Sequence, residues 1–298
     1  VYQVFLKQHK QPFRIWQDFQ KLEQEFQTIE PGLAAKLTAY LAQAKEFYQD
    51  TEYAVVKTNF YGLRDYVKKL ARVPKKHLPF LFTNMWQNAS RYFSSDEMRV
   101  IMTLTAFSLG DTPFHTPAIY ALLNYVEMEH DGYWIVEGGM YKIVEELVLA
   151  LKKKGVFFNF NTEVISVETQ GGKVGSLWDQ KGRRWSADIY VCNADAASFR
   201  GLVLKRKAFS VRRLDRMHWG MAPFTLCMGV EGKIENLLYH NYFLGSHSRE
   251  SAKKIFKPPV SPQKPYYSVN VLSKIFPESA PAGSESVLVH CPVPDLRF

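Results

Sequence analysis

The sequence has few of the residues that would indicate a disulfide-stabilised domain, a metal centre or a membrane-spanning protein. Its 298 residues include three cysteines, Cys192, Cys227 and Cys291, which are widely spaced and form no CxxC pair. Neither a disulfide framework nor a cysteine zinc site is therefore predicted. The eight histidines have no metal-ligand spacing, and we predict no metal. No apolar run reaches the roughly 18 residues needed to cross a bilayer.

Two kinds of nucleotide-binding signal are also missing. No GxGxxG motif occurs, which is the glycine-rich turn that brings a dinucleotide pyrophosphate to a helix N-terminus. Zinc-finger spacing and a basic-region helix are lacking as well, so the net charge of +9 does not predict nucleic-acid binding. This charge indicates either a solvated basic surface or attraction to an anionic membrane surface.

The apolar content of 46% is high enough to fill a substantial core. The sequence begins at Val1 without Met and ends soon after a strand-like run, SVLVHCPVPDLRF. We therefore expect this chain to be part of a larger protein.

Residues 1–130 have mainly helical patterns. The aromatic residues Phe13, Trp16, Phe19 and Phe26 recur near helical spacing, and a second apolar pattern follows Gly32. We expect these 130 residues to form a largely helical region that faces substrate and membrane.

Two helix starts are predicted inside this region. Ser94 with Glu97 three residues later has the spacing of a capping box. At the second start, the Thr116 hydroxyl is the predicted cap and Pro117 takes the first helical position. This helix would then present one apolar face, made of Ile119, Leu122, Leu123 and Val126.

A basic amphipathic segment lies between residues 60 and 82. Leu63, Val67 and Leu70 share one helical face, and an apolar run follows at 78–82. The opposite face of the helix carries Arg64, Lys68, Lys69 and Arg72. Such a segment could lie on an anionic bilayer, or it could be a surface helix that packs on its own protein.

From residue 131 onward helix alternates with short strands. An apolar stripe predicts a helix from Gly138 to Gly155, whose last turn carries lysines that complement the helix dipole. The strand patterns that follow are VFFNF (156–160), VISVET (164–169), VGSLW (174–178) and ADIYVCNAD (187–195). Residues 131–200 are therefore expected to form a helix and β-meander unit, and residues 201–298 a mixed, β-rich region. The predicted class is α/β, in the sense of a mixed α+β fold.

The longest diagnostic stretch is DTPFHTPAIYALLNYVEMEHDGYWIVEGGMYKIVEELVLALKKKGVFFNFNTEV, followed by SADIYVCNADA. Together these segments closely resemble the flavin-dependent carotenoid desaturases of bacterial and fungal type, which are the phytoene desaturases and their relatives. NYFLGSHSRESAKKIF and SESVLVHCPVPDL fall where that family has similar segments. The resemblance implies a fragment of a two-dinucleotide-binding-type flavoprotein, with a largely helical substrate and membrane region and a β-meander plus sheet region.

The resemblance implies FAD as cofactor, bound through three parts of the protein. The N-terminal GxGxxG part and the C-terminal glycine-rich part have no counterpart in this chain. What matches is the middle part, so we do not expect this chain alone to hold FAD stably. The matching positions are Val164, where main-chain groups would pair with adenine, the loop Asn193, Ala194 and Asp195, and Gly138 with Gly139.

The implied reaction is desaturation of a carotenoid or related isoprenoid polyene by hydride transfer to flavin. No catalytic residue is identified, and Glu137 is the first candidate. Asp111, Thr112, Pro113 and Trp134 are the candidates for substrate contact. The expected partners are a long apolar polyene and an anionic membrane surface, for a cytoplasmic protein at the membrane periphery.

Two kinds of alternative remain open. One is a related flavoenzyme, namely a carotenoid isomerase, a retinol-saturase-type enzyme or an amine oxidase. The other is a non-catalytic lipid-binding or membrane-docking module. The electron acceptor, the number of desaturations and the oligomeric state are not predicted.

Overall fold

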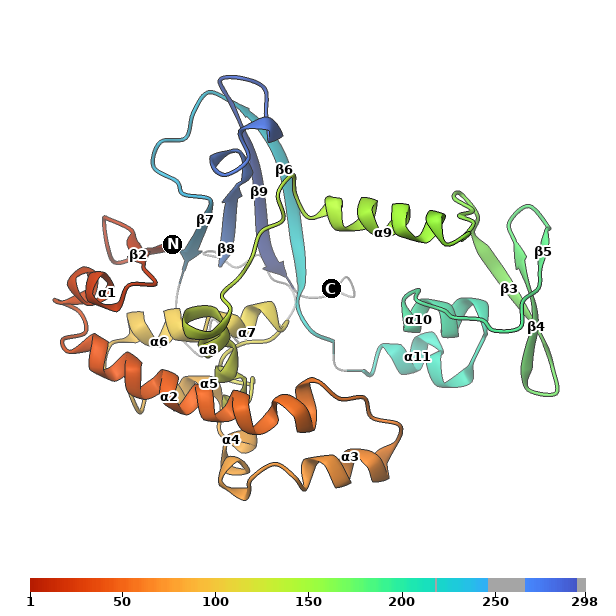
Figure 1. Cartoon of the computed structure of the whole chain (residues 1–298), viewed down its shortest axis with the longest axis horizontal. Coiled ribbons are helices and arrows are strands. Elements are labelled where there is room, and N and C mark those ends of the chain that lie inside the picture. The colour runs from red at the N-terminus through yellow and green to blue at the C-terminus, as the bar shows by residue number, and fades with distance from the viewer. Residues whose placement is uncertain (218, 246–265, 294–298) are drawn as a thin grey trace. The chain divides into compact units, whose positions relative to one another are not determined.

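The computed structural model describes residues 1–217, 219–245 and 266–293, and the chain divides into two compact units (Figure 1). Unit 1 comprises Val1–Met140 together with the described residues from Gly220 onward, and unit 2 comprises Tyr141–Trp219. Unit 2 is thus an insertion within the sequence of unit 1. Helices and strands are mixed, which confirms the predicted α/β class. Residues 246–256 of the resemblance lie outside the described residues.

Unit 1 contains a six-stranded sheet whose strands come from both ends of the chain. The pair β1–β7 is parallel, and every other neighbouring pair is antiparallel. In spatial order the strands are β2 (Phe13–Ile15), β1 (Tyr2–Leu6), β7 (His240–Leu244), β8 (Tyr267–Val271), β9 (Ser284–Val293) and β6 (Ala222–Glu231).

The first two strands correct the helical prediction for the start of the chain. Phe13 lies in β2, which pairs with β1, and the helix α1 (Phe19–Phe26) begins only after Asp18. The Asp18 carboxylate accepts the main-chain N–H of Gln20 and Lys21, as an N-cap does. The near-helical spacing of the aromatic residues from Phe13 to Phe26 therefore does not mark one helix, because this run of residues starts in β2 and ends in α1.

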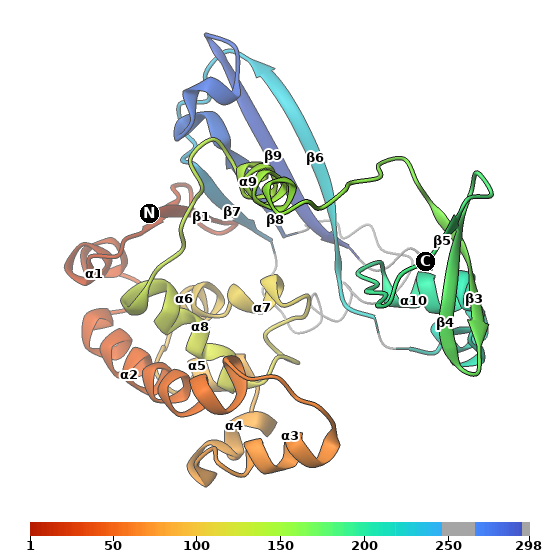
Figure 2. The same ribbon diagram turned by 45° about the vertical axis from the view of Figure 1, so that its right-hand side comes forward.

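The helices of unit 1 lie on one side of the sheet (Figures 1 and 2). The longest described helix is α2 (Leu33–Thr51), and its buried residues Leu37, Tyr40, Leu41 and Ala44 share a core with Val4 of the sheet. The α-helices that follow it in unit 1 are α3 (Leu63–Leu70), α4 (Pro79–Phe82), α5 (Met85–Ala89), α6 (Asp96–Met102), α7 (Thr105–Ser108) and α8 (Leu122–Tyr125).

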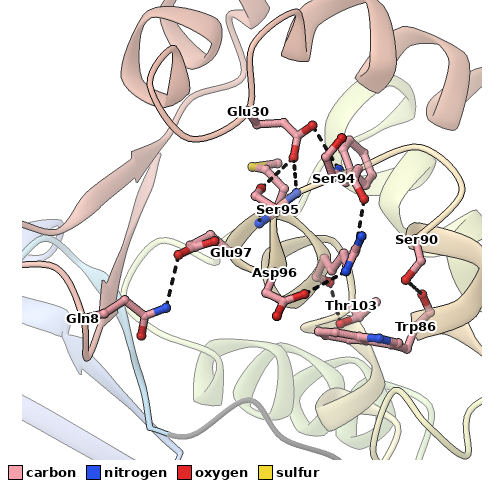
Figure 3. A network of polar contacts seen from close by, with 12 residues as sticks. Gln8, Glu30, Trp86, Ser90, Ser94, Ser95, Asp96, Glu97 and Thr103 are labelled. Atoms are coloured by element: carbon pink, nitrogen blue, oxygen red, sulfur yellow. Dashed lines mark hydrogen bonds and ion pairs between the residues drawn. The ribbon is translucent and has the colours of Figure 1, made fainter.

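The predicted capping box at Ser94 is wrong by one residue. α6 begins after Ser95, whose hydroxyl accepts the N–H of Met98. Ser94 instead donates its own N–H to the carboxylate of Glu30, 3.0 Å away (Figure 3). The cap therefore follows a tertiary contact that local spacing does not reveal.

Glu30 is a buried carboxylate that joins the α1–α2 connection to the start of α6 (Figure 3). It accepts hydrogen bonds from Ser94 N–H, from both the N–H and the hydroxyl of Ser95, and from the Lys36 ammonium. Burial opposes its ionisation, but these donors outweigh that effect and lower the pKa of Glu30 to about 2.

The helix predicted after Thr116 changes its repeat twice. It runs as a 3₁₀-helix (Ala118–Ala121), then α8, then a π-helix, η4 (Val126–His130). The Thr116 hydroxyl donates to the Thr112 carbonyl, so it does not cap this helix. Because each change of repeat rotates the buried face, the buried apolar residues are Ala118, Ala121, Tyr125 and Met128, and not the predicted stripe.

Unit 2 contains the predicted helix and meander. α9 (Tyr141–Lys153) is followed by a three-stranded sheet of β3 (Val164–Gln170), β4 (Lys173–Asp179) and β5 (Arg184–Trp185). Short helical segments follow: α10 (Ala196–Ser198), η5 (Phe199–Val203), η6 (Lys207–Phe209) and α11 (Val211–Leu214).

Two predicted strands of unit 2 are absent from its described residues. The segments 156–160 and 187–195 pair with no strand and have no regular structure before α10. A strand exists only where a neighbour satisfies its main-chain groups, and no neighbour is present. Phe157 is 92% exposed, Val191 is 89% exposed and α9 buries none of its residues. The strand predictions for these two segments are therefore wrong, and their apolar side chains include exposed ones.

We predict that Glu30→Ala lowers the free energy of unfolding by about 2–4 kcal/mol at pH 7, because the four donors from Lys36, Ser94 and Ser95 lose their acceptor. The folded pKa of Glu30 is depressed, so its contribution is complete above about pH 4.5 and is lost as the pH falls through 2. Denaturant unfolding of the variant and the parent should therefore converge as the pH is lowered. Glu235→Ala, at an exposed loop carboxyl, is the control. An equal loss for this control, or a pH-independent difference, would contradict the assignment.

Candidate functional site

A pocket of about 380 Å³ lies in unit 1, on the side of the sheet that faces the helices. Its walls are mainly apolar. They come from α7 and the residues around it, from the segment that enters β6, and from strands β7 to β9. The wall residues include Leu104, Phe107, Met221, Pro223, Tyr242 and Tyr266. A concave, mostly apolar space with a few polar groups is the usual form of a small-molecule site.

The floor of this pocket is polar. His240 pairs with Asn270 across β7 and β8, and Ser268 pairs with His290 across β8 and β9. Residues directly opposite in an antiparallel sheet point to the same face, and all four line the pocket. The His290 imidazole lies 3.0 Å from the Thr225 hydroxyl, measured from Nδ1 to Oγ1.

His240 is an uncharged histidine at neutral pH. Burial, with a smaller contribution from nearby His290, lowers the pKa of His240 to about 4. Its Nε2 is buried and has no hydrogen-bond partner, and the same is true of the side-chain oxygen of Asn270.

A half-buried carboxyl lies near the pocket. Glu127 sits in η4, with its carboxyl close to the Tyr2 phenol. Burial raises the pKa of Glu127 to about 7, although the N-terminal ammonium and Tyr2 favour its charged form. The Tyr2 ring makes an edge contact with Tyr242 of the pocket wall, at 5.6 Å between ring centroids. Glu127 is therefore linked to the pocket through two aromatic side chains.

Glu127 is not among the candidates predicted from sequence, because nothing local separates a half-buried carboxyl from an exposed one. The signal is tertiary, since Tyr2 and Tyr242 come from strands at opposite ends of the chain.

The predicted substrate residues fall into two places in unit 1. Thr112 and Pro113 are buried, and the Pro113 carbonyl accepts the N–H of Trp86, which fixes the segment against α5. Asp111 accepts the N–H of Thr112 at 2.6 Å. The preceding residue, Gly110, lines the pocket. Trp134 is 85% exposed and donates its ring N–H to the Asp131 carbonyl.

Two of the flavin candidates lie in unit 1. Gly138 and Gly139 have φ angles of 75° and 91°, which side chains rarely adopt, and a Cβ on Gly139 would meet no atom within 4 Å. Their backbone is therefore open to close approach by a ligand. Glu137, the catalytic candidate, is exposed beside them.

The other flavin candidates lie in unit 2. Val164 begins β3, an edge strand of its sheet, so main-chain groups on its outer side have no strand partner. Asn193, Ala194 and Asp195 form an exposed loop, and the Asp195 carboxylate accepts the N–H of Ser198. An open strand edge and an exposed loop fit what adenine pairing and flavin contact require. The residues present are thus compatible with FAD.

Two features are absent from the described residues. These residues include no cluster of three or more histidine, cysteine or acidic side chains that could hold a metal ion. Among the same residues, no helix combines the length and the apolar character of a membrane span.

A family model described as flavin containing amine oxidoreductase matches residues 9–294. A zeta-carotene-forming phytoene desaturase of Myxococcus xanthus is 30% identical over 272 residues, which cover 91% of this chain and 52% of that protein. Phytoene desaturase of Neurospora crassa is 28% identical, covering 87% and 45%. Carotenoid 3,4-desaturase of Haloarcula japonica is 28% identical, covering 98% and 59%.

The solved structures give a matching fold. An oxidoreductase from Methanosarcina mazei superposes with a TM-score of 0.53 at 14% sequence identity, covering 98% of this chain and 59% of that one. This likeness concerns the fold alone. In both comparisons the chain spans about half the length of the protein that it matches.

Proposed function

The chain belongs to the flavin-containing amine oxidoreductase family, and we propose that it is the central part of an FAD-dependent desaturase of a carotenoid or related isoprenoid polyene. The observation that carries this proposal is its similarity to phytoene and carotenoid desaturases over 87–98% of its length. The mostly apolar pocket of unit 1 supports it, because a polyene end needs a dry, apolar site.

FAD is the cofactor that family membership supports, and when bound it accepts a hydride from the substrate. In this proposal the main chain of Val164 pairs with adenine at the open edge of β3. The loop Asn193–Asp195 and the backbone of Gly138–Gly139 supply further contacts. The pocket of unit 1 holds one end of the polyene and excludes water.

Desaturation also releases a proton, and Glu127 is the side chain we propose to accept it. Its carboxyl is half-buried, its pKa is about 7, and the nearby Tyr2 ring contacts Tyr242 of the pocket wall. A base with a pKa near the working pH transfers protons most effectively. Glu137, the candidate from sequence, is exposed and so has no comparable environment.

The proposed activity is tested by incubating the flavin-loaded protein with phytoene and measuring the mass of the product. A desaturase gives products lighter by successive pairs of hydrogens. A product of unchanged mass would identify an isomerase. Oxidation of an amine in place of the polyene would identify an amine oxidase, and no reaction with either would favour a lipid-binding module.

We expect Glu127→Gln to lower the rate of desaturation by about 10²–10⁴-fold. The parent rate should rise with pH through about 7, since a proton acceptor works in its ionised form and Glu127 ionises there. The variant should lose this dependence while keeping its flavin. Glu129→Gln, at an exposed residue of the same helical segment, is the matched control. A variant with the parent rate and pH profile would remove Glu127 from the reaction.

In a full-length version of the protein, Val164→Pro should weaken FAD retention, because proline removes the N–H assigned to adenine. Val164→Ala keeps that N–H and should retain the cofactor. Flavin absorbance after gel filtration measures both, with circular dichroism to check folding. Equal flavin content in the two folded variants would reject the adenine contact.

The basic segment predicted from sequence has exposed apolar side chains beside basic ones. α3 has no buried residue, and Tyr61 (87% exposed), Leu63 (78%) and Phe82 (88%) project from it and its flanks. The segment between them carries Arg64, Lys68, Arg72 and Lys75. We propose that this surface binds an anionic bilayer, since exposed apolar side chains beside basic ones complement anionic headgroups and acyl chains.

Vesicles that contain phosphatidylserine should bind the protein at low salt and release much of it as salt rises, because surface charges are screened. Phosphatidylcholine vesicles should bind less. Replacing Lys68 and Lys75 by Glu should reduce binding at least tenfold, since each basic residue contributes about 1 kcal/mol. Lys181→Glu, in an exposed turn of unit 2, should have little effect. Binding that ignores both salt and the double variant would rule out this surface.

A further inference from the structure

Two buried polar atoms in the floor of the unit 1 pocket have no partner. They are Nε2 of His240 and the side-chain oxygen of Asn270. The two residues lie opposite each other in the antiparallel pair β7–β8, so their side chains point to the same face and into the same pocket. A buried polar group without a partner destabilises the fold. Two such groups side by side in a cavity indicate that something polar is bound between them.

The two atoms have complementary roles. A neutral imidazole can carry its proton on Nε2 and donate it, whereas an amide oxygen only accepts. A hydroxyl group satisfies both, because its oxygen accepts from His240 and its hydrogen goes to Asn270. A methyl group would leave both atoms unpaired. A carboxylate would face the Asn270 oxygen without a hydrogen to share.

The apolar walls and the volume of the pocket indicate which kind of molecule carries the hydroxyl group. Leu104, Phe107, Met221 and Pro223 surround the polar floor with apolar surface. The neighbouring polar groups are already engaged in part, since His290 is within hydrogen-bond distance of Thr225. The volume of about 380 Å³ suits the end of a terpenoid chain and not its whole length.

We propose that this pocket binds the hydroxyl-bearing end of a terpenoid, with His240 and Asn270 fixing the oxygen. The enzyme would then prefer a polyene with a terminal hydroxyl over the corresponding hydrocarbon. This preference rests on the proposed desaturase function, whereas recognition of the alcohol does not, because it needs neither flavin nor turnover.

The test compares geraniol, an acyclic terpenoid alcohol, with 2,6-dimethylocta-2,6-diene, which has the same skeleton without the hydroxyl. Isothermal titration of the purified protein should show geraniol binding at least tenfold more tightly. A site built around a hydroxyl rejects the analogue that lacks it, because its own polar groups stay unpaired. His240→Phe and Asn270→Leu should each remove this discrimination, and Thr169→Val, an exposed position on β3, should preserve it.

Equal affinity for the alcohol and the hydrocarbon, or binding of neither, would overturn the proposal. Both outcomes are measured on the parent protein, so the proposal can be rejected even if a variant fails to fold. The two proposals fail separately. Selective binding of geraniol by a protein that cannot desaturate any polyene would reject the enzyme and keep the alcohol site. Desaturation without such selectivity would do the reverse.

Discussion

The parallel pairing of β1 with β7 is the contact on which the rest of unit 1 depends. It brings Gln3–Leu6 beside Asn241–Leu244, and the helices of unit 1 and the whole of unit 2 lie between these segments in sequence. Closing so long a loop costs conformational entropy, which burial of Val4 and Leu6 in the helical core helps to offset. The pairing also places Tyr2 of β1 against Tyr242 of β7, which belongs to the pocket wall.

Local patterns were sufficient where an element is determined by its own residues. α9 and the β3–β4 hairpin follow from apolar period and turn residues, and their positions agree with the prediction. Strands β6 to β9 lie in the region that was expected to be β-rich. Prediction failed where contact with a residue distant in sequence determines the local structure. β2 is a strand because β1 lies beside it, and α6 begins after Ser95, where both Ser94 and Ser95 contact the distant Glu30. The same holds for the site. Motifs located the segments that could contact flavin, but the surroundings of Glu127 come from tertiary packing and the facing pair His240–Asn270 from strand register.

Unit 2 shows the opposite case, in which apolar patterns are present without burial. The stripe of α9 and the segments at 156–160 and 187–195 are exposed. Strands that are apolar on both faces and covered by helices are typical of parallel dinucleotide-binding sheets. The chain also spans about half the length of the phytoene desaturases it matches, and it contains no GxGxxG motif. These observations agree with a unit that completes its sheet with segments outside this sequence. They also explain why FAD binding is proposed for the larger protein.

Hydride transfer from a polyene to flavin is tested most directly by anaerobic mixing of the flavin-loaded protein with phytoene in a single turnover. The absorbance of oxidised flavin should fall as the desaturated product forms, because without oxygen the reduced cofactor persists. Flavin that stays oxidised in the presence of phytoene and of its hydroxylated derivatives, while a chemical reductant still bleaches it, would contradict the assignment of this chain to a carotenoid desaturase.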